Sequence, residues 1–171
     1  NQPVTVTLTA SDVGIPAPTP DAYTKLLLHF NGADGSTNFT DEMGYSVTAF
    51  GNAQIDTAQS KFGSASALFD GSGDYLSIAD SDDWNFGTGD FTIDFWVRFN
   101  ALPSAGNCQR IYSQIGATGY PQWYFVLRNT AGVYSWDLDN YPSAAGRTIS
   151  VSKTTTVSTG TWYHIAFIRN G

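Results

Sequence analysis

Five aspartates lie in the stretch DGSGDYLSIADSDDW, residues 70–84, which contains no Lys or Arg. Such a density of carboxylates fits a calcium site, a catalytic site, or turns between strands. A helix–loop–helix calcium loop needs Gly at its sixth position and Glu at its twelfth. A frame from Asp70 puts Tyr75 and Ser81 there, and a frame from Asp80 puts Asn85 sixth, so both fail. Turn chemistry is therefore favoured for most of these aspartates, with an irregular oxygen-rich calcium site as the alternative.

The sequence contains few candidates for catalytic groups. Glycosidases use two carboxylates placed across the scissile bond, and alternate residues of one strand would present them to one cleft. The chain has a single Glu, Glu42, and Asp94 is the only acid on its longest strand-like run, so no paired pattern is found. The two histidines, His29 and His164, lie inside strand-like runs, and no Ser lies in a nucleophile-elbow motif. The sequence therefore predicts a protein that is not an enzyme.

Aromatic residues are the stronger functional signal. They are concentrated between residues 120 and 141, beside the loops GATGYPQ and DLDNYPSAAG. Aromatic faces next to Asn and Asp suit sugar rings, because the C–H face stacks while hydroxyls find polar partners. We predict Tyr120, Trp123, Trp136 and Tyr141 as ligand-binding residues. The alternative is that these are ordinary core aromatics of alternating strands.

The composition limits the classes of binding partner that the chain can have. The net charge is -7 and the pI about 4.4, which excludes the basic surface that nucleic acids require. No apolar run has the length of a membrane span, so we expect no membrane partner. The one cysteine, Cys108, cannot form an internal disulfide and is read as incidental.

Short strands separated by turns account for almost the whole chain. In FTIDFWVRFN, residues 91–100, Phe91, Ile93 and Phe95 alternate with Thr92 and Asp94 without a break, as on a strand with one face on a core. Further runs of this kind are 4–8, 25–30, 45–50, 65–70, 75–79, 110–115, 123–128, 133–138, 148–157 and 161–170. Regular short strands with Gly, Asn, Asp and Ser between them predict an all-β sandwich or barrel.

The two ends differ from the middle. Residues 1–22 contain alternating prolines at Pro16, Pro18 and Pro20 and are predicted to form an extended arm or linker. The chain closes on Asn-Gly directly after a strand-like run, which is a strong hairpin signal. We therefore expect a domain over residues 23–171 that lacks its C-terminal strands.

Four segments, in this order, resemble the laminin-G-like, concanavalin A-like jelly-roll domain. They are KLLLHFNGADGSTNFTDEMG, SKFGSASALFDGSGDYLSIADSDDW, FTIDFWVRF and STGTWYHIAFIRNG. Their amino-acid sequences most resemble the copies of this domain in tailed-phage virion and tail proteins. The resemblance implies a two-sheet antiparallel β-sandwich in which DGSGDYL is a hairpin between two core strands and DSDDWNFGTGDF leads into the long strand.

The resemblance also implies a role. It predicts a non-catalytic virion surface or tail module that adheres to glycans or cell-surface polysaccharide, with other virion proteins or copies of itself as further partners. The implied location is the virion or the extracellular space. Calcium is the implied cofactor, with Asp34 and Asp41 as its ligands. Two alternatives stay open: a purely structural decoration or lattice protein assembled by strand exchange, and a secreted bacterial adhesin or accessory domain of a glycosidase.

Overall fold

The computed structural model describes residues 4–8, 20–115, 121–140 and 149–170. The chain divides into two compact units, the first formed by residues 1–97 and 162–171 and the second by residues 98–161. Every regular element in the described residues is a strand except one 3-10 helix, η1 (Asp82–Trp84). The all-β prediction is confirmed. In the described part of the chain, no helix is long and apolar enough to span a membrane.

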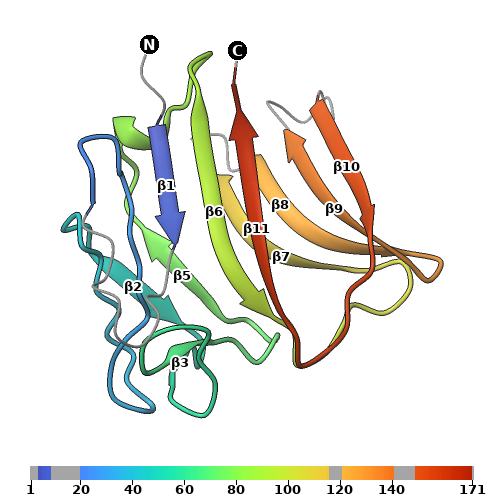
Figure 1. The fold of residues 1–171 in the computed structure, drawn as a ribbon, viewed down its shortest axis with the longest axis horizontal. Coiled ribbons are helices and arrows are strands. Elements are labelled where there is room, and N and C mark those ends of the chain that lie inside the picture. The colour runs from blue at the N-terminus through green and yellow to red at the C-terminus, as the bar shows by residue number, and fades with distance from the viewer. Residues whose placement is uncertain (1–3, 9–19, 116–120, 141–148, 171) are drawn as a thin grey trace. The chain divides into compact units, whose positions relative to one another are not determined.

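A three-stranded sheet of the first unit contains the longest predicted strand. Its order is β1 (Val4–Leu8), β6 (Phe91–Arg98) and β11 (Trp162–Arg169), with β1 parallel to β6 and Val4 opposite Phe91 (Figure 1). Phe91, Ile93 and Phe95 are each 4% exposed, so one face of β6 meets the core as its period-two pattern predicts. Of the predicted arm, the structure describes β1 and the backbone from residue 20, while residues 9–19 lie outside the described residues.

Two ribbons of two strands complete the first unit. β2 (Val47–Phe50) pairs with β5 (Tyr75–Ile78), and β3 (Gln54–Asp56) pairs with β4 (Ser66–Leu68). The segment DGSGDYL joins β4 to β5, which pair with different strands and not with each other, so its prediction as a hairpin between two core strands is wrong. DSDDWNFGTGDF does lead from β5 through η1 into β6.

The predicted opening strand at residues 25–30 is also wrong. Only Leu28 forms an isolated bridge, with Asp41, although Leu26 and Leu27 are buried. The backbone N–H of Leu27 donates to the Asp41 carboxylate at 2.8 Å, and its carbonyl accepts from Glu42 N at 3.0 Å. Because the loop at residues 41 and 42 takes both backbone groups, Leu27 is satisfied without a neighbouring strand.

The second unit is built on one antiparallel sheet of long, curved strands (Figure 1). Its order is β10 (Ile149–Thr155), β9 (Val133–Asn140), β8 (Pro121–Thr130) and β7 (Cys108–Ile115). Phe125, Leu127 and Trp136 lie on one face and are at most 9% exposed. The Trp136 ring stacks on Phe125 with centroids 5.2 Å apart. We call this the core face and the opposite side of the same strands the polar face.

Candidate functional site

The aspartates of residues 70–84 act mainly on the local backbone. Asp74 accepts hydrogen bonds from Asn52 N at 2.9 Å and from Asp70 N at 2.6 Å. Asp70 accepts from the Asn52 amide at 2.9 Å and from Ser72 N at 2.7 Å. The Asn52 and Ser72 bonds hold the pKa of Asp70 below its usual value. We call Asn52, Asp70 and Asp74 the Asn52 clamp, because together they tie the start of β5 to the end of β2.

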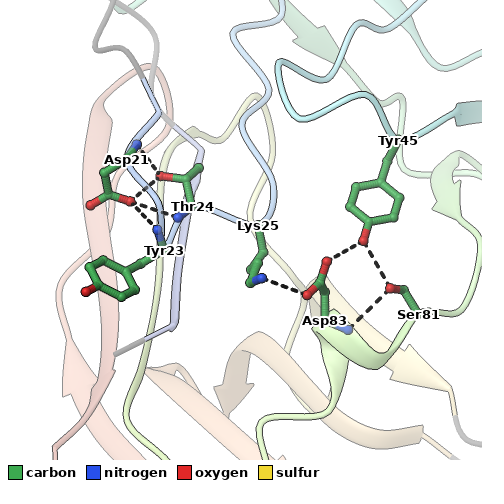
Figure 2. A network of polar contacts seen from close by, with 7 residues as sticks. All are labelled: Asp21, Tyr23, Thr24, Lys25, Tyr45, Ser81 and Asp83. Atoms are coloured by element: carbon green, nitrogen blue, oxygen red, sulfur yellow. Dashed lines mark hydrogen bonds and ion pairs between the residues drawn. The ribbon is translucent and has the colours of Figure 1, made fainter. Parts of the chain in front are cut away.

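Asp83 belongs to a second network, shown in Figure 2. Its carboxylate lies 2.8 Å from the Lys25 ammonium and accepts a 2.6 Å bond from the Tyr45 hydroxyl. The Tyr45 oxygen also lies 3.0 Å from Ser81 Oγ, which accepts from Asp83 N and caps η1. Lys25 and Tyr45 lower the pKa of Asp83. The network joins residues 21–25, the loop before β2 and η1. The turn prediction is thus confirmed for Asp70 and Asp74, which accept from backbone N–H groups, whereas the Asp83 carboxylate bonds to the side chains of Lys25 and Tyr45.

The predicted metal ligands have similar backbone roles. Asp41 is 6% exposed, and its two carboxylate oxygens accept from Leu27 N at 2.8 Å and Tyr45 N at 2.9 Å. Asp34 is exposed and accepts from Thr57 N at 3.0 Å. Within the described residues, no group of three His, Cys, Asp or Glu side chains is arranged to hold a metal ion. The geometry gives these two carboxylates structural roles, and calcium binding stays a prediction.

One histidine does meet a carboxylate. His164 Nε2 on β11 lies 3.2 Å from Asp94 Oδ2 on β6, and its ring stacks on Trp96 with centroids 5.0 Å apart. Among the described residues, His164 bonds to no serine hydroxyl. The Ser–His–Asp arrangement needed to activate a serine nucleophile is therefore incomplete here.

The predicted ligand-binding aromatics do not form one group. Trp136 is 9% exposed and packs between Phe125 and Phe99 on the core face. Trp123 is half-buried and shares that face, since it lies two residues before Phe125 on the same strand. Tyr120 and Tyr141 lie outside the described residues. Trp123 and Trp136 therefore lie on the core face, as the alternative of ordinary core aromatics predicts. A binding role for either tryptophan stays a prediction.

Tyr124 lies on the polar face instead, together with a group of charged side chains. The Arg110 guanidinium on β7 lies over the Tyr124 ring, 5.1 Å from its centroid. Arg128, two residues further along β8, bonds to Asp137 through Nε at 2.6 Å and to Asp139 through Nη2 at 3.4 Å. Ser152 on β10 donates its hydroxyl to Asp137 at 2.7 Å. All four strands of the sheet thus contribute to one polar cluster.

The carboxylates of the cluster are buried, whereas its hydrogen-bond donors are at least partly exposed to solvent. Asp139 is 0% and Asp137 4% exposed, whereas the Arg128 side chain keeps 30% of its surface. Arg110 and Ser152 are exposed. Burial raises the pKa of Asp137, but bonds from Ser152 and Arg128 outweigh it and leave that pKa below its usual value. The bond to Asp137 in turn raises the pKa of Arg128 despite its partial burial. Asp137 is therefore ionised at neutral pH and fixes the guanidinium.

Asp137 and Asp139 are a paired, alternating set of acids on one strand, which the sequence analysis missed. The run YSWDLDN places Tyr134, Trp136 and Leu138 on one side of β9 and both acids on the other. That alternation was the signal that could have revealed them. Arg128 could have been recognised in the same way, as the only charged residue of the run WYFVLR.

The family of the chain is shown by comparison with known proteins. Residues 70–171, more than half of the chain, match the laminin G family described as the concanavalin A-like lectin/glucanases superfamily, and the chain belongs to it. This superfamily is built on a β-sandwich jelly roll, so the predicted fold class is the right one. Searches of the curated proteins and of the solved structures find no match.

Proposed function

We propose that the chain is a non-catalytic carbohydrate-binding module and that it binds glycans on the polar face of the β7–β10 sheet. The superfamily is compatible with carbohydrate binding. The observation that carries the proposal is the fixed position of Arg128, clasped by two buried carboxylates while almost a third of its side chain stays exposed.

An ion pair whose carboxylates are buried is an inefficient way to stabilise a fold. Removing charges from water is expensive, and apolar residues of similar volume often stabilise a fold as well or better. A guanidinium has five N–H donors in a rigid fork, of which Asp137 and Asp139 engage only some. The remaining donors are held in a fixed direction, ready to bond sugar hydroxyls without a large loss of side-chain entropy.

Neighbouring groups complete the chemistry that a sugar needs. Ser152 adds an exposed hydroxyl, and Tyr124 adds a half-buried aromatic ring beside the exposed Arg110. An amphipathic ring beside a few convergent polar groups is the usual composition of a carbohydrate site. Because the two arginines and the two aspartates balance in charge, the polar face suits a glycan better than a strongly charged polymer.

The same geometry supports binding without cleavage. A glycosidase needs one carboxyl group with a raised pKa to protonate the leaving oxygen. Asp137 has a lowered pKa and is bonded to Arg128 and Ser152. Its environment favours the charged form, which is the opposite of what a proton donor requires.

We further propose that the module acts at the surface or tail of a phage particle, or otherwise outside the cell, where it adheres to a cell-surface polysaccharide. The proposed location rests on the order and the residues of the motifs in residues 25–171. The mass of the native assembly, measured from its source, tests it: a particle-sized assembly supports a virion component, and a small free species contradicts it.

The binding proposal is tested by incubating the purified chain with a panel of neutral and acidic polysaccharides. Retardation in polysaccharide-containing native gels measures binding, and release of reducing ends measures cleavage. We expect retardation by at least one polysaccharide with no release of reducing ends. Cleavage of the bound polysaccharide would contradict the non-catalytic assignment, and no retardation at all would favour a purely structural role.

A further inference from the structure

The ribbon of β2 and β5, in the first unit, has an outward face that the proposed function does not use. Along both strands the residues alternate between half-buried and exposed. Val47, Ala49 and Leu76 pack against the buried cluster of Phe39, Ile55 and Ala65. The exposed phase holds two cross-strand pairs, Thr48 opposite Ser77 and Phe50 opposite Tyr75.

Phe50 and Tyr75 are exposed in spite of their size. Phe50 is 41% and Tyr75 52% exposed, and their rings stack 4.5 Å apart at an angle of 8°. A stacked cross-strand pair adds a little to ribbon stability. The ribbon does not need these two rings for its packing, because the apolar residues on its other face already contact the core. Packing alone therefore does not explain two large exposed rings.

The Asn52 clamp connects the backbone segments that carry the two rings. Phe50 lies two residues before Asn52, and Tyr75 directly follows Asp74. Asn52 N and Asp70 N both donate to the Asp74 carboxylate, at 2.9 Å and 2.6 Å. Gly51 makes the connection with a φ of 69°, a conformation that side chains rarely adopt. The ring pair is thus presented by a braced strand end, which lowers the entropic cost of binding.

The surroundings of the pair indicate the chemistry of its ligand. Thr48 and Ser77 put two exposed hydroxyls next to the rings on the same face. Both charged members of the clamp, Asp70 and Asp74, are acidic, and the whole chain carries a net charge of -7. These charges disfavour an anionic ligand. Aromatic surface beside hydroxyl groups matches the C–H face and the hydroxyl rim of a neutral sugar.

We propose that Phe50 and Tyr75 form a second ligand surface that stacks on a neutral sugar ring, with Thr48 and Ser77 bonding its hydroxyls. This surface uses different residues from the polar face and a different unit of the chain. A chain with two such surfaces would bind a polysaccharide by two contacts, which increases avidity when both can engage the same polymer.

The test compares Tyr75→Ser with Tyr23→Ser in the intact chain. Tyr23 is also exposed, at 39%, so both variants remove one exposed tyrosine. The probes are immobilised starch, mixed-linkage β-glucan, mannan and galactan as neutral polysaccharides, with alginate as the acidic one. Thermal unfolding of each variant confirms that the fold is kept, and Phe50→Thr, which retains a strand-forming residue, provides a second way to remove the surface.

We expect Tyr75→Ser and Phe50→Thr to lower affinity for a neutral polysaccharide roughly tenfold, which is the scale of one lost aromatic contact, and Tyr23→Ser to leave it unchanged. Equal binding by wild type and Tyr75→Ser, binding to alginate only, or no binding to any probe would overturn the inference. Arg110→Gln, run in parallel, separates the two sites. Loss in Arg110→Gln alone would leave the polar face as the binding site, and loss in Tyr75→Ser alone would leave only the β2–β5 surface.

Discussion

Arg128 Nε lies 2.6 Å from Asp137 Oδ2, on the polar face of the second unit. This pair joins β8 to β9 and connects through Ser152 to β10. It fixes a cation whose side chain is still 30% exposed. The stability of the sheet and the proposed binding of glycans therefore depend on the same three side chains.

Replacing Arg128 with Met should destabilise the fold strongly. The substitution leaves the carboxylates of Asp137 and Asp139 buried without their shared cation, and breaking such a group costs about 3–5 kcal/mol. Urea unfolding measures the loss. Arg110→Met, at an exposed arginine of the same face, is the matched control and should cost less than about 1 kcal/mol. Equal losses in the free energy of unfolding would show that the cluster adds no more stability than an exposed arginine does.

The Asp137 carboxyl should make stability depend on acidity. Its pKa in the folded state lies below the ordinary 3.8, so its contribution is full above pH 3.8 and is lost as the pH falls through the lower, folded-state value. Unfolding free energies at pH 6 and pH 3 should therefore differ more in wild type than in Asp137→Asn. A larger pH dependence in Asp137→Asn would contradict this sign.

Asp41 should matter much more than Asp34 for folding. Asp41→Ala leaves the N–H groups of Leu27 and Tyr45 without their acceptor, which costs about 2–4 kcal/mol. Asp34→Ala removes an exposed acceptor of the Thr57 N–H and should cost about 1 kcal/mol or less. Thermal unfolding compares the two variants, and a larger loss in Asp34→Ala would contradict the roles assigned here.

Calcium binding by Asp34 and Asp41 has its own test. If these carboxylates ligate the ion, millimolar calcium should raise the Tm of wild type and not that of Asp34→Ala, because a ligand that binds only the folded state stabilises it. Magnesium at the same concentration is the control for ionic strength. Equal Tm values of wild type with and without calcium would contradict the prediction.

Gly51→Ala should weaken the β2–β5 ribbon. An added Cβ would lie 2.9 Å from Gly73 O and against the Asp74 carboxylate, and the φ of 69° disfavours any side chain. We expect a loss of about 1–3 kcal/mol in urea unfolding. Gly71→Ala has nothing within 4 Å of the added Cβ although its φ is 88°, so it isolates the cost of backbone conformation from that of the clash.

The strands were predictable where one phase was apolar and the other polar. β6 was recognised by its unbroken alternation, and the buried Phe91, Ile93 and Phe95 confirm the face it predicted. β3 was missed because it is three residues long and has a single apolar residue, Ile55. At residues 25–30 a strand was predicted where the structure has none. The apolar residues of this run are buried, but its backbone bonds to a loop.

The site was harder to predict because WYFVLR is apolar on both phases of β8. Composition alone could not separate Trp123, which lies on the core face, from Tyr124, which lies on the polar face. Only the phase of Arg128 marks the polar side, and only pairing across strands brings it to Asp137 and Asp139. Phe50 and Tyr75 were missed for a related reason: exposed aromatics look like core residues until the pairing of β2 with β5 is known.

Glycan binding on the polar face is tested by comparing Arg110→Gln with Lys153→Gln in polysaccharide affinity gels. Both substitutions remove one exposed positive charge from the same sheet, but Lys153 neighbours Ser152 on β10 and therefore points to the opposite phase. We expect Arg110→Gln to lose affinity for the polysaccharide that retards wild type and Lys153→Gln to keep it. Equal retardation of both variants and wild type would contradict glycan binding on the polar face.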